Sequence, residues 1–247
     1  MIKLELPEKP IQLTDEIEKE LTEQFKKNGT AVWNKAYIKE PLLTMSNNKC
    51  AYSEQKLGER SAYMWIDHFK HKDKYKDAVV EWGNLLPSCQ KCNTTKNDWD
   101  VLIDPIVNPL TDNPGDYLYI KGFRFHAKNE KGKNTIEAVA LNDRIHFVTP
   151  RADSAFLIID LLSAHYKLLL EVKTDRKRNN TINRIKSILE QSGPQHEFSA
   201  AISTYLLYED PLFQEIKSYL ISIEKWDEQF QQIEAELTRI ALPPFTE

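Results

Sequence analysis

The sequence predicts a fold of the α+β class that is mostly α-helical. Apolar residues recur at helical spacing towards both ends of the 247-residue chain, whereas strand-like segments are few and short. Hydrophobic residues make up 41% of the chain and charged residues 28%, a composition that argues against disorder. No run of about 18 apolar residues occurs, so we expect no membrane span.

Two helices are predicted in the N-terminal segment, residues 1–45, which we treat as a helical domain. Thr14 can cap a helix over residues 13–28, because its hydroxyl can accept a hydrogen bond from a backbone N–H of the first turn. A second, shorter helix is predicted over residues 30–43, with apolar and aromatic residues on one face.

The central region, residues 46–149, contains both the candidate chemistry and the predicted strands. Its first half is rich in cysteine, histidine and lysine and has few periodic runs. Strands are predicted over residues 117–120 and 135–141, and turns over residues 121–122 and 129–134.

The C-terminal half, residues 150–247, is predicted to be helical. Residues 155–172 are strongly apolar but too short to cross a bilayer, which predicts a buried helix. Further helices are predicted over residues 198–207, 211–223 and 226–240.

Charge is unevenly distributed along this half. Residues 173–186 include six basic residues and one acidic residue, whereas residues 187–247 include eleven acidic and three basic residues. The acidic tail would repel phosphates, so any nucleic acid must be held elsewhere. The basic stretch is most simply a solvated helix face, and a contact with nucleic acid or a partner is the alternative. The net charge of −4 excludes a uniformly basic nucleic-acid binder.

Three cysteines, Cys50, Cys89 and Cys92, occur in the central region. An odd number cannot form a disulfide framework, and the Cys-x-x-Cys spacing of the last two is typical of metal binding in a reducing compartment. Buried, unliganded thiols are the alternative. The N-terminus does not show the basic and then apolar stretch of a signal peptide, so we expect a cytoplasmic protein.

An aspartate and a histidine are adjacent at Asp67-His68, and Asn84 and Asn93 follow. Metal-assisted phosphodiester hydrolysis requires a divalent cation on oxygen ligands, a base that works near neutral pH and a group that orients this base. The four residues offer these functions. Adjacent side chains on a strand point to opposite faces, so Asp67 and His68 can serve one site only at a strand end or bend.

These motifs resemble the HNH, or ββα-metal, family of endonucleases. The resemblance rests on Asp67-His68, Asn84 and Asn93, framed by the cysteines. Within the family, the longer strings are similar to the PtuB group, the HNH subunits of Septu-type and retron-associated anti-phage systems. These strings are Lys-Cys50-Ala-Tyr-Ser-Glu54, Ile-Asp67-His68-Phe, Trp82-Gly-Asn84-Leu-Leu and Cys92-Asn93-Thr-Thr-Lys96.

The resemblance implies a fold and a set of roles. A ββα-metal core would be flanked by the N-terminal helices and by the helical C-terminal half, which would bind a PtuA-like ATPase subunit. His68 would be the general base of the catalytic site, and Asn84 its positioning residue. Asp67 and Asn93 would hold a catalytic Mg²⁺ or Mn²⁺, and the three cysteines a structural Zn²⁺. The chain would cut nucleic acid, DNA or RNA, as the nuclease effector of an anti-phage complex.

Four lysines are candidate nucleic-acid contacts. Lys70, Lys72 and Lys74 follow His68 closely, which favours contact with phosphates over a merely solvated loop. Lys96 either contacts a phosphate or caps a surface helix.

Two positions depart from the family pattern. Ser53 stands where the family has a further cysteine, and a neutral hydroxyl is a poor substitute for a thiolate. His71 stands where the family usually has proline, and it would either complete the zinc site or face the substrate. Zinc would then be held by three cysteines and another ligand, be bound weakly, or be absent. The rival interpretation is a non-catalytic zinc-knuckle nucleic-acid-binding or scaffold protein.

Overall fold

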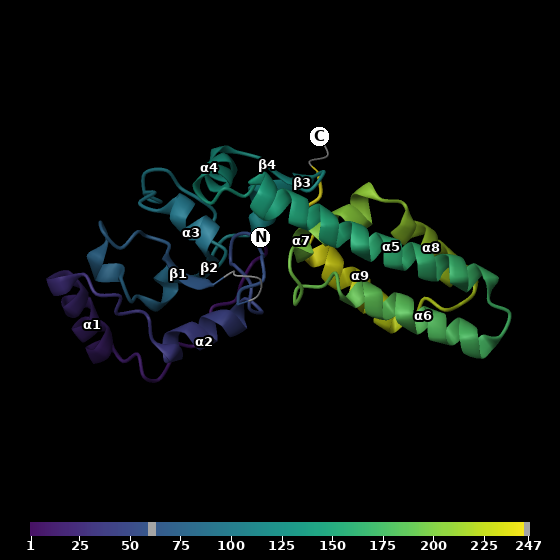
Figure 1. The fold of residues 1–247 in the computed structure, drawn as a ribbon, viewed down its shortest axis with the longest axis horizontal. Coiled ribbons are helices and arrows are strands. Elements are labelled where there is room, and N and C mark those ends of the chain that lie inside the picture. The colour runs from purple at the N-terminus through teal and green to yellow at the C-terminus, as the bar shows by residue number, and fades with distance from the viewer. Residues whose placement is uncertain (59–62, 245–247) are drawn as a thin grey trace. The chain divides into compact units, whose positions relative to one another are not determined.

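The computed structural model describes residues 1–58 and 63–244 of the chain (Figure 1). The described residues form nine α-helices and four short strands, which pair into two separate two-stranded antiparallel sheets. The predicted α+β class with a predominance of helix is therefore confirmed.

The chain divides into two compact units. The first comprises Met1–Leu118 and His126–Asn142, and the second comprises Tyr119–Phe125 and Asp143–Glu247. The predicted N-terminal and central regions thus contribute mainly to one unit. The division into three domains that the sequence suggests stays a prediction.

Two strands and a helix form the centre of the first unit. β1 (Met64–His68) and β2 (Leu85–Cys89) pair in antiparallel fashion. α3 (Gln90–Lys96) follows β2 directly and packs on both strands. The connection between the strands contains two 3₁₀ turns, Lys76–Ala78 and Trp82–Asn84.

Two helices precede these strands. α1 (Asp15–Asn28) lies where the sequence predicts it, and the Thr14 hydroxyl accepts a hydrogen bond from a first-turn N–H at 3.3 Å. The helix ends at Gly29, whose φ of 69° lies in the left-handed region that favours glycine. α2 (Ala36–Met45) begins later than predicted, because residues 30–35 form hydrogen-bonded turns instead.

A shared apolar core joins these helices to β1 and to the connection that follows it. The buried residues of this core are Leu13, Leu21, Phe25, Val32, Ile38, Leu42, Ile66, Val79, Val80, Trp82 and Leu85. Their burial removes apolar surface from water and holds the N-terminal segment against β1. Residues 31–39 are thereby brought to the pocket described below.

The predicted strand over residues 135–141 is wrong, because most of this segment belongs to the end of α4 (Glu130–Ala138). Asn129 caps this helix by accepting a hydrogen bond from the Gly132 N–H at 3.0 Å. A Cβ atom at position 132 would lie 2.1 Å from the Tyr117 carbonyl oxygen, so glycine is what lets the helix start there. Of the predicted turn over 129–134, residues 130–134 are therefore helical as well.

The second sheet is a hairpin of β3 (Leu118–Lys121) and β4 (Arg124–Ala127). It confirms the predicted strand over residues 117–120. The turn predicted next is also present, with Gly122 at a φ of 55°. A 3₁₀ turn, Pro114–Asp116, precedes the hairpin.

The second unit is helical, as predicted. Its α-helices are α5 (Thr149–Glu171), α6 (Asp175–Glu190), α7 (Ser199–Thr204), α8 (Leu212–Ser222) and α9 (Glu228–Ile240), with π-helical turns at Arg144–Val148 and Tyr205–Glu209. α5 packs on α6, α7 and α8, and α9 packs on α6 and α7.

α5 is not buried throughout, which corrects the predicted burial of residues 155–172. Leu157, Leu161 and Leu168 are 60%, 36% and 47% exposed. Their spacing of four and seven residues places them in one stripe along the helix, which we call the α5 leucine stripe. Among the residues that the structure describes, no helix has both the length and the apolar character that crossing a membrane requires.

Candidate active site

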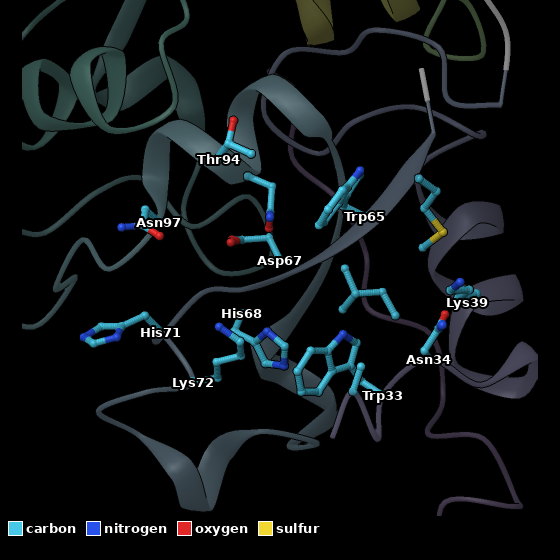
Figure 2. A pocket seen from close by; sticks show the side chains of 14 residues that line it. Trp33, Asn34, Lys39, Trp65, Asp67, His68, His71, Lys72, Thr94 and Asn97 are labelled. Atoms are coloured by element: carbon cyan, nitrogen blue, oxygen red, sulfur yellow. The ribbon is translucent and has the colours of Figure 1, made fainter. Parts of the chain in front are cut away.

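A pocket of about 530 Å³ opens in the first unit at the end of β1 (Figure 2). It is lined by Asp67 and His68 of β1, by Asn93 of α3 and by His71 and Lys72 of the loop after β1. Asp67 and His68 can both line it because β1 ends at His68. Residues from separate motifs therefore meet at one pocket.

The imidazole of His68 is buried and fixed. Its Nε2 lies 2.9 Å from the Val79 carbonyl oxygen, and a carbonyl can only accept, so Nε2 carries the proton. Burial lowers the pKa of His68 to about 4, against the opposing effect of Asp67, so the ring is neutral near pH 7. Its Nδ1 has no hydrogen-bond partner among the described residues and retains a lone pair.

An aromatic side chain, Trp33, also packs against the imidazole ring of His68. The indole of Trp33 meets it edge-on with ring centroids 4.4 Å apart, and Phe25 packs in turn against Trp33 at 5.7 Å. The apolar core of the first unit thus holds the imidazole through Trp33. We did not expect this role for Trp33 from its place in a predicted helix.

Asn84 does not line the pocket but ties together the loop that supports His68. Its Oδ1 accepts from the Lys70 N–H at 2.7 Å, and its Nδ2 donates to the carbonyls of Lys70 and Ala78 at 3.2 and 2.8 Å. Ala78 directly precedes Val79, whose carbonyl orients the imidazole. Asn84, only 1% exposed, is thus placed to position His68 through the backbone.

The carboxylate of Asp67 has one partner on each oxygen. Oδ2 accepts from the Tyr52 hydroxyl at 2.6 Å, and Oδ1 lies 3.2 Å from the Lys96 ammonium. Burial, together with the negative charge of Asp67, raises the pKa of Tyr52 well above its usual value, so the phenol stays protonated and donates. Each carboxylate oxygen has a further lone pair that can face the pocket.

Asn93 is available as a second oxygen ligand. It is partly exposed at the pocket, and its carboxamide has no hydrogen-bond partner among the residues that the structure describes. One carboxylate and one carboxamide oxygen at a common pocket are the kind of donors that Mg²⁺ or Mn²⁺ accepts from a protein, with water and substrate completing the shell. The donor set fits such a cation.

The predicted phosphate contact of Lys96 is wrong. Its side chain is 0% exposed, and its ammonium donates to the His68 carbonyl at 2.7 Å as well as to Asp67. An ammonium held in this way compensates a buried carboxylate and has no access to a phosphate. Nor does it cap a surface helix, which was the other expectation.

The lysines that follow His68 each form an ion pair with an acid. The pairs are Lys70 with Glu81, Lys72 with Asp73 and Lys74 with Asp100. Lys72 lines the pocket, whereas Lys70 and Lys74 do not. Surface pairs of this kind are weak, so a phosphate could still displace the acids. Phosphate contact by these three lysines stays a prediction.

Besides Trp33, the pocket residues that the motif analysis missed include Trp65 and Lys39. Trp65 lies two residues before Asp67 on β1 and is 44% exposed. Lys39, in the N-terminal segment, also lines the pocket. An aromatic residue at strand spacing from Asp67 was a usable signal for Trp65. No local signal marks Lys39, because the packing of α2 on the central core brings it there.

His71 lines the pocket and is not part of the cysteine group, so it does not complete a zinc site. Its ring lies edge-on to Tyr75, with centroids 5.5 Å apart. Its Nδ1 is buried without a hydrogen-bond partner among the described residues. Of the two expectations for His71, a zinc ligand or a residue that faces the substrate, its place at the pocket agrees with the second.

The three cysteines meet, although they come from separate segments. The Sγ atoms of Cys50, Cys89 and Cys92 lie within 4.8 Å of one another, and all three residues are buried. Zinc bonds to sulfur at about 2.3 Å, which sets tetrahedral sulfurs roughly 3.8 Å apart. A small contraction of the group would therefore accommodate a metal ion such as zinc.

The chemistry of the group agrees with this fit. Burial, and the sulfurs of Cys50 and Cys89, raise the pKa of the Cys92 thiol well above its usual value. Burial acts against ionisation of Cys50 as well, but hydrogen bonds from Cys89 and Cys92 lower the pKa of Cys50 well below its usual value. Metal binding would therefore have to release protons from Cys89 and Cys92 in particular. The Ser53 Oγ lies 3.7 Å from the Cys89 Sγ, so an oxygen stands beside the group where the family pattern has sulfur.

The cysteine group also connects to the pocket. Tyr52, which orients Asp67, lies between Cys50 and Ser53, and Lys96 lies one helical turn after Cys92 on α3. An ion held by the three sulfurs would thus fix both partners of the Asp67 carboxylate. The cysteine group can support the pocket without contacting a substrate.

Comparison with known proteins shows the family. No protein-family model matches the chain. The chain is 36% identical to the Septu protein PtuB of Bacillus thuringiensis over 241 residues, which covers 94% of this chain and 92% of that protein. It is 26% identical to a Septu protein PtuB of Bacillus mycoides (strain KBAB4), covering 67% of this chain and 72% of that protein. The chain therefore belongs to the PtuB family of Septu proteins.

Proposed function

We propose that the chain is a metal-dependent HNH endonuclease that hydrolyses phosphodiester bonds. One observation carries this proposal: a neutral, buried imidazole, fixed through its Nε2 by the Val79 carbonyl, shares a pocket with Asp67 and Asn93. A base, a carboxylate and a carboxamide at one pocket are what metal-assisted hydrolysis of a phosphodiester requires.

The residues of the chain act as follows. His68 accepts the proton of the attacking water at Nδ1, while the Val79 carbonyl stabilises the imidazolium that forms. Asn84 keeps this carbonyl in place. Tyr52 and Lys96 hold the Asp67 carboxylate in its orientation through one contact to each oxygen. A divalent cation bound by Asp67 and Asn93 would polarise the phosphate and stabilise the leaving oxygen.

The local topology supports this assignment. β1, β2 and α3 follow one another as two antiparallel strands and a helix that packs on both. The order matches that of a ββα-metal core, in which the base lies at the end of the first strand and a metal ligand on the helix. His68 ends β1 and Asn93 lies on α3, in keeping with this order.

We further propose that the chain acts in the cytoplasm as the nuclease effector of an anti-phage defence complex with a PtuA-like ATPase subunit. The likeness to Septu proteins named PtuB supports the defence role. The α5 leucine stripe supports a protein partner, because exposed apolar groups in a row commonly mark interaction sites. The stripe lies within the predicted partner-binding residues 150–247.

A cleavage assay tests the proposal. The purified chain, alone and together with its ATPase, is incubated with duplex DNA, single-stranded DNA and tRNA in Mg²⁺ or in EDTA. We expect weak cleavage by the chain alone and stronger cleavage by the complex, in both cases abolished by EDTA. Binding of nucleic acid without cleavage under any of these conditions would favour the non-catalytic alternative.

A further inference from the structure

Trp65 is an exposed aromatic residue in a place where the backbone leaves it little freedom. It lies in β1 opposite Ser88 of β2, so its position is fixed by strand pairing. It lines the pocket and is 44% exposed. Its indole makes no hydrogen bond and no ring contact with any residue that the structure describes. Large aromatic side chains are normally buried, so an indole that is fixed and open at a pocket is available to a ligand.

The placement of Trp65 relates it to the phosphate site. Trp65 and Asp67 are two residues apart on one strand, so their side chains lie on the same face, roughly 7 Å apart along the chain. This separation is comparable to that between a phosphate and the base of the same or the next nucleotide. Figure 2 shows Trp65 and Asp67 next to each other at the pocket, with Trp33 and His68 across from them.

The two tryptophans of the pocket have different roles. Trp33 is held edge-on by His68 and Phe25, so it forms a fixed wall. Trp65 has no such partners. A volume of about 530 Å³ lies within the range of pockets that enclose small ligands, so a nucleobase fits beside Trp65.

The charged side chains beside Trp33 and Trp65 suit a nucleic-acid strand that continues past the pocket in both directions. Lys39 forms no ion pair with any described acid, in contrast to Lys72. In Figure 2, Lys39 and Asn34 lie beyond the tryptophans as seen from Asp67 and His68, and Lys72 lies on the opposite side. A backbone that places one phosphate at Asp67 and His68 thus has a cation available in each direction.

We infer that Trp65 is a stacking platform for an unpaired nucleobase next to the scissile phosphate, and that Lys39 contacts the adjoining backbone. This inference rests on the proposed nuclease function and specifies its substrate class. Bases inside a duplex are already stacked on their neighbours and offer no free face, so the site selects a nucleotide that is single-stranded, looped or flipped out. Either DNA or RNA can supply such a nucleotide.

Binding measurements test the platform independently of cleavage. Dissociation constants of the full-length chain are measured by fluorescence anisotropy in EDTA at one fixed salt concentration. The probes are a labelled single-stranded oligonucleotide, as DNA and as RNA, and a fully paired duplex of the same sequence. The variants are Trp65→Leu, which keeps an apolar side chain but removes the aromatic face, and Trp65→Tyr, which keeps that face.

We expect wild type to bind at least one single strand more tightly than the duplex. Trp65→Leu should weaken single-strand binding by about tenfold or more, as loss of one base–aromatic stack does, and change duplex binding little. Trp65→Tyr should restore most of the affinity. Equal affinity of Trp65→Leu and wild type for both single strands would overturn the inference. So would an equal loss for the duplex, or no binding of any probe.

The backbone contact has its own matched control. Lys39→Ala should lower single-strand affinity and reduce the dependence of log Kd on log salt by about one ion. Lys35→Ala removes an equal charge four residues earlier, outside the pocket, and should change neither quantity. Identical behaviour of the two variants would remove Lys39 from the site. Suppose that single-strand binding depends on Trp65 but that the ATPase complex cleaves none of the substrates. This result would support the stacking role of Trp65 and refute only the nuclease function.

Discussion

The ammonium group of Lys96 lies 3.2 Å from the Asp67 carboxylate, and the two side chains are only 0% and 5% exposed. Lys96 is therefore the ion-pair partner of a buried carboxylate. A divalent cation on Asp67 would share the carboxylate with this lysine. The stability of the pair and the binding of metal should then be linked.

We predict that Lys96→Met lowers the free energy of unfolding by roughly 3–5 kcal/mol in EDTA, because it leaves a buried carboxylate unpaired. Millimolar Mg²⁺ should stabilise this variant more than it stabilises wild type, because the cation then replaces the missing charge. Urea unfolding followed by tryptophan fluorescence measures both effects. Lys70→Met, which breaks an exposed pair with Glu81, serves as the control and should cost about 1 kcal/mol or less. The same Mg²⁺ increment in Lys96→Met and wild type would count against Asp67 as a metal ligand.

Asn84→Ala should disturb the imidazole as well as the fold. The substitution leaves the part-buried Lys70 N–H without its acceptor and the buried Ala78 carbonyl without its donor, at a cost of about 1–3 kcal/mol, and releases the backbone next to Val79. We predict a smaller share of the Nε2–H tautomer of His68, measured from the ring ¹⁵N chemical shifts, together with slower cleavage. A variant that loses stability while its tautomer and its cleavage rate stay as in wild type would reduce Asn84 to a purely structural residue.

Ser53→Cys should strengthen metal binding by the cysteine group. The Ser53 oxygen already lies 3.7 Å from the Cys89 sulfur, so a thiolate at this position can complete a four-sulfur site. We predict that the variant retains its zinc in a chelator competition that removes about half of the zinc from wild type, as measured by elemental analysis. Cys92→Ser should retain less zinc than wild type. Equal zinc content in all three proteins would show that the group holds no zinc.

The α5 leucine stripe should be required for assembly with the ATPase. We predict that Leu161→Asp, which places a charge in the stripe, abolishes co-purification of the two subunits while the helical circular dichroism stays as in wild type. Ile221→Asp is the matched control, because Ile221 is 53% exposed on α8, outside the stripe. Undiminished assembly of Leu161→Asp would place the partner surface elsewhere.

The sequence predicts those parts of the molecule that local physics decides. Thr14 marks the start of α1 because its hydroxyl satisfies a first-turn N–H wherever the helix packs. The segment 135–141 is misjudged as a strand because its apolar residues suit one. It is helical instead because Asn129 caps the first turn and because Gly132 permits the close approach of the helix to Tyr117. The close approach at Gly132 depends on a tertiary contact with Tyr117, which no local sequence pattern records.

The candidate site likewise contains residues that a sequence pattern indicates and residues that only tertiary packing brings there. The spacing of Asp67, His68 and Asn93 marks them as candidates, because the chemistry requires these residue types together, and the three do line one pocket. The role of Lys96 is not readable in the same way, since a lysine three residues after Asn93 fits a phosphate contact equally well until Asp67 is seen beside it. Lys39 reaches the pocket through packing between segments distant in sequence, and no motif records that.

The central claim is that His68 accepts the proton of the attacking water. Its most direct test is the cleavage rate of His68→Ala in the ATPase complex with Mg²⁺, after circular dichroism has shown that the variant is folded. His146→Ala is the control, because its ring pairs with Asp143 in the second unit and lies outside the pocket. We predict a loss of about 10²- to 10⁴-fold for His68→Ala and none for His146→Ala. A folded His68→Ala complex that cuts as fast as wild type would contradict the account.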